Sequence, residues 1–239
     1  MAMPKSPILL IDLADLPSLA AAMTQPDPAR LILWHLGEEG GAAERRAAVV
    51  REHAELLGAA ELIISESWRP GVGRTGDQAG LWQALMLVQA AIVARHRACE
   101  KIIWPVQVGP DAARVSELVD RALAVAELAD ATATADAAAR PGGASASRPG
   151  GSLIIDLPLV DLADEQVVDL ADDCGAPLRA FWPCESVTGH APSGGGGGAG
   201  GQAPSGGGGE PCGACGGCDR WRRAFHECGL PWPWAAERV

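Results

Sequence analysis

Short apolar runs alternate with amphipathic stretches over the first 130 residues, and this alternation restricts the chain to few folds. Strand-like runs cover Ile8–Ile11, Leu31–Trp34 and Leu62–Ser65, and a fourth, Lys101–Val108, contains a proline. Strands that alternate with helices form parallel sheets with helices on both faces. The pattern therefore predicts an α/β fold built on a doubly wound parallel sheet.

The stretches between these runs have the periodicity of helices. In residues 42–57 apolar side chains recur every three or four positions, and Gly58 ends the pattern. Further helices are expected at 79–99, 112–128 and 160–171, the first of them strongly apolar and the second preceded by a possible cap at Asp111.

Composition divides the chain into three parts. Residues 1–130 form the predicted Rossmann-like core, and residues 131–152 are rich in Ala, Gly and Ser with two prolines. Such a composition cannot bury a core, so we expect a flexible connection there. Residues 153–239 form a C-terminal part that contains a Gly-rich loop at 189–211. We expect this loop to be flexible as well.

Four cysteines in the C-terminal part have the spacing of a zinc site. Cys212, Cys215 and Cys218 form two consecutive C-x2-C pairs, and Cys184 lies before the Gly-rich loop. Four thiolates complete a tetrahedral zinc site and leave no open position, which is typical of a structural metal. A longer intervening loop adds only about 0.6 kcal/mol to the closure cost per doubling of length. The sequence thus predicts a small zinc-binding module.

Other interpretations of these cysteines stay open at the level of sequence. They are surface thiols in a flexible tail, or they form disulfides. His226 and His190 are alternative ligands in case Cys184 is not the fourth.

Charge and the N-terminal segment argue against several classes of partner. The formal net charge is −11, which repels phosphate backbones, so we expect no nucleic-acid binding. The apolar run near the N-terminus contains Asp12 and is followed by Asp15, so it fits neither a signal peptide nor a membrane span. Reduced thiols in a metal cluster favour the cytoplasm.

The C-terminal third resembles the 7-cyano-7-deazaguanine synthases, which are cytoplasmic ATP-dependent enzymes of queuosine and deazapurine biosynthesis. The segments that carry the resemblance are Ile155–Leu162, Cys174–Leu178, Phe181–Cys184 and Pro211–Cys218, followed by Ala224-Phe225 and Gly229. They follow the order of that family's motifs. The first two thirds of the chain match more loosely, in the order of strands and helices.

This resemblance implies a nucleotide α-hydrolase fold of the PP-loop type, a zinc ion held by the four cysteines, a deazapurine ligand and a homodimer. The family activates 7-carboxy-7-deazaguanine with ATP, captures ammonia and dehydrates the amide to a nitrile. Its pyrophosphate cradle is a Ser-Gly-Gly-x-Asp-Ser loop after the first strand. In such a loop, glycines let backbone amides reach the phosphates.

The loop has a different sequence here. The corresponding positions are Ile11–Leu16, and of the family's residues only Asp15 is present. Asp12 and Leu13 replace the two glycines, so we expect side-chain bulk and a repelling carboxylate where phosphate would lie. The sequence therefore predicts that the ATP site is lost. Residues 71–76 form another glycine-rich loop, which is either a phosphate cradle or a plain surface loop.

Three functions remain. The first is a non-catalytic zinc protein that keeps the fold and serves as a binding or scaffolding partner; the residues favour it, and the catalytic residues are left unassigned. The alternative is an active, divergent ATP-dependent ligase that converts a carboxylate and ammonia to an amide or nitrile. The third is a deazapurine-binding protein without turnover, in which Trp182 stacks on the ligand; otherwise Trp182 packs on the zinc module.

Overall fold

The computed structural model describes residues 6–37, 41–66, 79–139, 152–184 and 211–235. Within them, five strands form one sheet in the order β3-β2-β1-β4-β5, and every neighbouring pair is parallel. The strands are β1 Ile8–Ile11, β2 Leu31–Leu36, β3 Glu61–Ser65, β4 Lys101–Ile103 and β5 Ile154–Asp156. The prediction of an α/β fold with a parallel sheet is confirmed.

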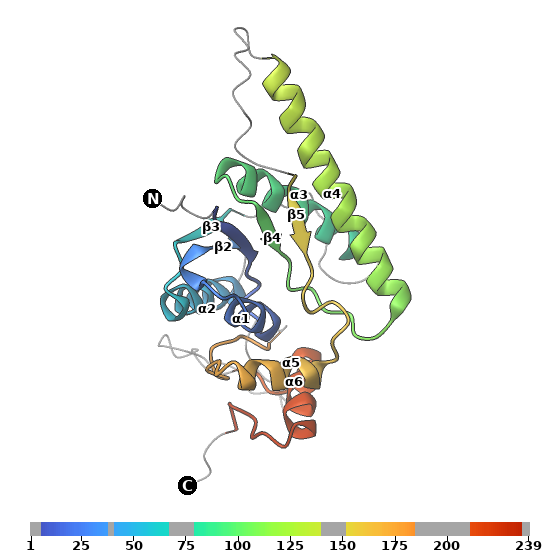
Figure 1. Cartoon of the computed structure of the whole chain (residues 1–239). Coiled ribbons are helices and arrows are strands. Elements are labelled where there is room, and N and C mark those ends of the chain that lie inside the picture. Colours follow the sequence, from blue (N-terminus) through green and yellow to red (C-terminus); the bar gives the residue numbers. More distant parts are fainter. Residues whose placement is uncertain (1–5, 38–40, 67–78, 140–151, 185–210, 236–239) are drawn as a thin grey trace, which may run out of the picture.

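Helices cover both faces of this sheet (Figure 1). Their bounds are α1 Leu16–Met23, α2 Gly41–Leu57, α3 Ala79–His96, α4 Ala112–Ala139, α5 Asp164–Asp173 and α6 Gly216–Glu227, with a 3-10 turn at Pro28–Arg30. Successive strand residues point to opposite faces. Accordingly Ile8 and Leu10 pack with α1, α5 and α6, whereas Leu9 and Ile11 pack with α3 and α4. Burial on both faces explains the uninterrupted apolar runs.

Several elements differ in extent from the prediction, β4 and α4 most of all; helix α5 begins at Asp164 instead of residue 160. Strand β4 ends at Ile103, shortly before Pro105, which has no N–H to donate to a ladder. Helix α4 continues to Ala139 and so occupies residues 131–139 of the Ala-rich stretch. Alanine has the highest helix propensity, so the composition of this stretch favours continuation of the helix.

The C-terminal part shares the core of the N-terminal part. Strand β5 pairs with β4 and completes the sheet, and α5 packs against α1 and α6. Phe181 and Phe225 belong to the same buried cluster as Leu10. The predicted loops at 71–76 and 189–210 lie outside the described residues. Among the described helices, none combines the length and apolarity needed to cross a membrane.

Candidate metal centre and adjoining pocket

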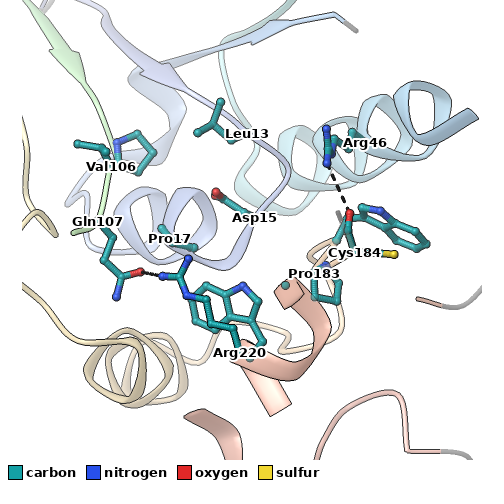
Figure 2. A pocket seen from close by; sticks show the side chains of 13 residues that line it. Leu13, Asp15, Pro17, Arg46, Val106, Gln107, Pro183, Cys184 and Arg220 are labelled. Atoms are coloured by element: carbon teal, nitrogen blue, oxygen red, sulfur yellow. Dashed lines mark hydrogen bonds between the residues drawn. The ribbon is translucent and has the colours of Figure 1, made fainter. Parts of the chain in front are cut away.

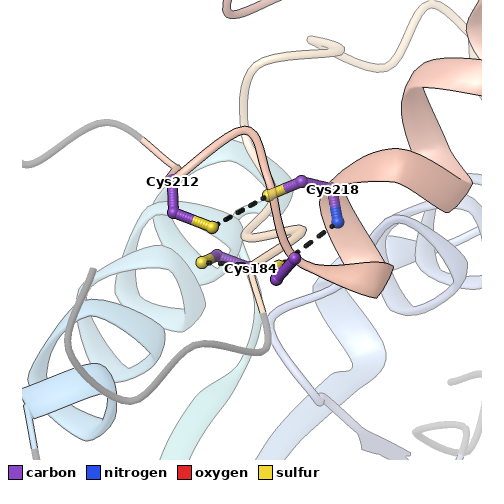
Figure 3. Close-up of side chains that lie close together, drawn as sticks. Cys184, Cys212 and Cys218 are labelled. Carbon is purple, nitrogen blue, oxygen red and sulfur yellow. Dashed lines mark hydrogen bonds between the residues drawn. The ribbon is translucent and has the colours of Figure 1, made fainter. Parts of the chain in front are cut away.

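The four predicted cysteines meet beside the N-terminus of α6 (Figure 3). Cys184 follows the loop after α5, and Cys212 precedes a turn in which Gly213 has a φ of +67°. A left-handed φ suits glycine, which has no Cβ. Cys215 is the N-cap of α6, and Cys218 lies in its first turn. The spacing of two residues thus directs the three C-terminal thiols to one point.

The spacing of the sulfurs fits a tetrahedral metal site. All four Sγ atoms lie within 4.8 Å of one another. The Sγ atoms of Cys212 and Cys218 are 3.9 Å apart, and those of Cys184 and Cys215 are 3.8 Å apart. With Zn–S bonds of about 2.3 Å, tetrahedral geometry places sulfurs about 3.8 Å apart. The cluster can therefore hold a zinc ion with no further ligand. None of the seven cysteines is in a disulfide bond, so the disulfide interpretation is wrong.

Burial affects the charge of the thiols in the cluster. Cys184 and Cys218 are buried, and burial raises the pKa of the Cys218 thiol far above its ordinary value. A coordinated metal ion deprotonates thiols outright and supplies the charge that buried thiolates need. Of the alternative ligands, His226 is exposed on α6 and is not part of the cluster, and His190 lies outside the described residues.

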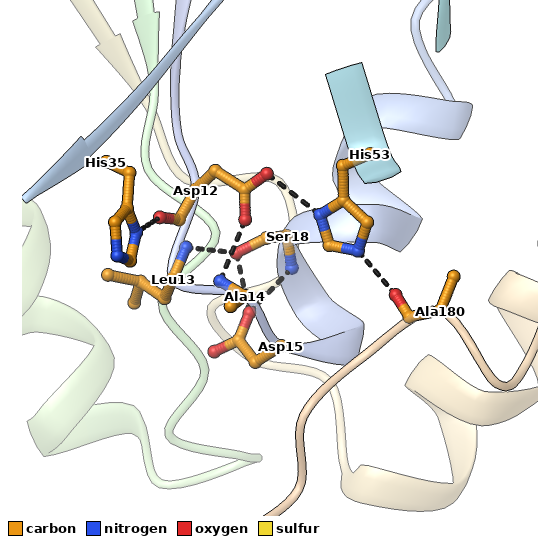
Figure 4. A network of polar contacts seen from close by, with 8 residues as sticks. All are labelled: Asp12, Leu13, Ala14, Asp15, Ser18, His35, His53 and Ala180. Atoms are coloured by element: carbon orange, nitrogen blue, oxygen red, sulfur yellow. Dashed lines mark hydrogen bonds and ion pairs between the residues drawn. The ribbon is translucent and has the colours of Figure 1, made fainter. Parts of the chain in front are cut away.

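In the loop between β1 and α1, backbone N–H groups donate hydrogen bonds to side chains of the loop and of α1 (Figure 4). The backbone N–H of Leu13 donates to Ser18 Oγ at 3.0 Å, and that of Ala14 donates to Asp12 Oδ1 at 2.8 Å. The amides of Leu13 and Ala14, in the loop that the resemblance equates with a pyrophosphate cradle, are thus already paired. A phosphate would have to displace both side chains to reach them.

In the first turn of α1, the N–H of Ser18 is also paired with a side chain. Asp15 caps the helix, and its Oδ1 accepts hydrogen bonds from the N–H and the hydroxyl of Ser18 at 2.9 and 2.6 Å. Pro17, in the first turn, has no N–H. A helix N-terminus binds anions through its unpaired N–H groups and positive field. Here a carboxylate already takes that place.

Asp12 corrects one sequence-based expectation. Its carboxylate was expected to face the phosphate position and repel the ligand, but this side chain is buried and forms an ion pair with His53 of α2. Asp12 Oδ2 lies 2.8 Å from His53 Nδ1, and His53 Nε2 faces the carbonyl oxygen of Ala180. The Asp12 carboxylate thus accepts the N–H of Ala14 and pairs with His53 of α2, and it does not face the surface where it could repel phosphate.

The protonation state of His53 follows from its partners. Both ring nitrogens face acceptors, so both carry hydrogens and the ring is an imidazolium. Burial lowers the pKa of His53, but the charge of Asp12 and the hydrogen bonds outweigh burial, so the pKa is raised above 6.5. Sequence analysis missed this pair. The sequence did carry a sign that His53 is buried: it lies three residues after Val50 and four before Leu57, on the apolar face of α2.

A cavity of about 240 Å³ lies between the sheet and the cysteine cluster (Figure 2). Asp15 follows β1 and Gln107 follows β4, and both line it together with Arg46, Trp182 and Arg220. The strand order reverses between β1 and β4. The carboxyl ends of the strands at such a reversal are the usual ligand site of open α/β sheets.

The walls of this cavity carry charged side chains of both signs and aromatic surface. Arg220 donates to both carboxylate oxygens of Asp164, from Nε to Oδ2 at 2.7 Å and from Nη2 to Oδ1. Its Nη2 also donates to Gln107 Oε1 at 2.9 Å. Drug-sized ligands need about 300–1,000 Å³. The cavity therefore suits a smaller, polar molecule better than a complete nucleoside triphosphate.

Trp182 belongs to the wall of this cavity. Its side chain lines the cavity, and the guanidinium of Arg45 lies 5.2 Å from the ring centroid. Its Nε1 is buried and has no acceptor among the described residues. Its backbone N–H donates to the carbonyl of Ala14 at 2.8 Å, which joins the Trp182 segment to the loop after β1.

Comparison with known proteins does not assign the chain to a family. No protein-family model matches the chain, and no curated protein is significantly similar to it.

Proposed function

We propose that the chain is a zinc-binding relative of the 7-cyano-7-deazaguanine synthases, with a PP-loop type fold, that has lost the ATP chemistry of that family. One observation carries the loss of ATP chemistry: the amides of the loop after β1 are occupied by the chain's own side chains. Asp12 binds the N–H of Ala14, and Ser18 binds that of Leu13. Adenylation needs those groups for pyrophosphate.

Zinc in this proposal has a structural role. Cys184, Cys212, Cys215 and Cys218 would hold it with four sulfurs, so no position is left for water or substrate. The ion would join the start of α6 to the segment that ends at Cys184, and these two segments pack on the α1 face of the sheet. Metal binding of this kind contributes directly to folding.

The cavity favours a second candidate, which is binding of a small heterocycle without turnover. Its position at the strand-order reversal, its size and the ring of Trp182 suit a planar polar molecule such as a deazapurine. Arg46 and Asp15 supply hydrogen-bonding groups at its wall. A homodimer and a cytoplasmic location remain part of the proposal through the family resemblance.

Zinc-loaded protein incubated with ATP, ammonium and 7-carboxy-7-deazaguanine tests the proposal, with an active synthase run in parallel. AMP and the nitrile product are followed by mass spectrometry. We expect the active synthase to form both and this chain to form neither. Turnover by this chain would support the active divergent ligase instead. Saturable binding of 7-carboxy-7-deazaguanine without ATP would support the second candidate.

A further inference from the structure

Residues 180–184 connect the cysteine cluster to the cavity. Cys184 contributes its sulfur to the cluster, and Trp182, Pro183 and Cys184 line the cavity. One short piece of chain therefore forms part of the metal site and part of the wall. Whatever fixes its position acts on both.

Helix α2 holds the beginning and the end of this segment. The imidazolium of His53 donates to the carbonyl of Ala180. At the other end, Arg46 Nη2 lies 3.5 Å from the carbonyl oxygen of Cys184, a long contact that is drawn in Figure 2. Arg46 thus reaches the backbone of a residue whose thiol belongs to the cluster.

The middle of the segment is held by two further contacts. The N–H of Trp182 donates to the carbonyl of Ala14, and Arg45 of α2 packs over the Trp182 ring. Cation–π contacts of this kind add attraction without fixing one hydrogen-bond geometry. These contacts hold the middle of the segment, and the Cys184 thiol in the cluster is a further point of attachment at its C-terminal end.

We propose that Arg46 is a positioning residue for the metal centre, and that zinc in turn fixes the wall of the cavity through residues 180–184. This inference rests on the zinc binding of the proposed function. Residues that orient metal ligands from outside typically change metal affinity about 10–100-fold when removed. The coupling is reciprocal, because a metal that favours one position of the segment is itself favoured by contacts that hold that position.

The first test measures zinc affinity by competition with a chromophoric chelator. The proteins are the wild type, Arg46→Ala and a matched control, Arg51→Ala, which changes an exposed arginine of the same helix. Because the Arg46 contact is long and reaches a carbonyl, we expect a loss near the lower limit, about tenfold. Arg51→Ala should keep the wild-type affinity. Equal affinities in all three proteins would overturn the role of Arg46.

The second test follows amide hydrogen exchange in the peptide that contains residues 180–184. In the wild type, zinc should slow exchange at the Trp182 amide, which donates to Ala14. In zinc-loaded Arg46→Ala, the same amide should exchange faster than in zinc-loaded Arg51→Ala. Exchange that is the same with and without zinc would refute the coupling to the cavity wall.

Zinc uptake and the effect of Arg46 on it are tested separately. A wild-type protein that takes up no zinc refutes the proposed function and this inference together. A protein that binds zinc with equal affinity in both arginine variants keeps the proposed metal centre and refutes the inference alone.

Discussion

Removal of His53 is expected to destabilise the protein more than any surface substitution. His53→Ala leaves the Asp12 carboxylate buried without its counterion, and neither side chain exposes more than 1 % of its surface. Breaking such a pair from one side costs about 3–5 kcal/mol. For a chain of this size, about 2–4 °C is lost per kcal/mol, so the melting temperature should fall by about 6–20 °C.

The assay is urea denaturation of zinc-saturated protein, followed by circular dichroism. His96→Ala is the matched control, because His96 is exposed at the end of α3. The control should change the free energy of unfolding by less than about 0.5 kcal/mol. A loss below about 1 kcal/mol for His53→Ala would refute the buried ion pair as a source of stability.

The cost of His53→Ala should also depend on pH, with a defined sign. The folded-state pKa of His53 is raised above 6.5, with Asp12 and Asp15 as its nearby negative charges. A raised pKa stabilises the fold fully below the unfolded value, and this contribution disappears as pH rises through the folded value. The cost should therefore be larger near pH 6 than near pH 9. A cost that grows with pH would contradict the assigned imidazolium.

Three further predictions concern the metal, the core and the first helix. Cys215→Ser should abolish stoichiometric zinc, measured by elemental mass spectrometry, and should increase proteolysis after residue 184, because one of the four ligands is lost although serine can still cap α6. Phe181→Ala should lower the free energy of unfolding by about 3–5 kcal/mol in the same urea assay, since its ring is buried among aromatic rings of the C-terminal part. Asp15→Ala should cost about 1 kcal/mol there by removing the cap of α1, and an unchanged midpoint would show that the cap contributes nothing.

The sheet could be predicted from the sequence because its signals are local. Buried parallel strands such as Ile8–Ile11 are apolar at every position, and helix α2 has a clear period and ends at Leu57, just before a glycine. The lengths of β4 and α4 were harder to predict from the sequence. They depend on where a proline interrupts a ladder and on how far an alanine-rich sequence continues a helix.

The cysteine cluster was also accessible from sequence, since two C-x2-C pairs have few other uses. The Asp12–His53 pair was not, because its members are 41 residues apart and belong to different elements. In sequence, Asp12 looks like an acidic residue at a phosphate loop. Only the tertiary packing of α2 shows that it is paired, buried and bonded to the Ala14 amide.

Calorimetric titration of ATP with Mg²⁺ into the zinc-loaded protein tests the central claim most directly. The proposed function predicts no saturable heat, because the amides of Leu13 and Ala14 are already bonded to Ser18 and Asp12. An active synthase titrated under the same conditions should bind. Saturable ATP binding by this chain would contradict the loss of the phosphate site and would favour the active ligase.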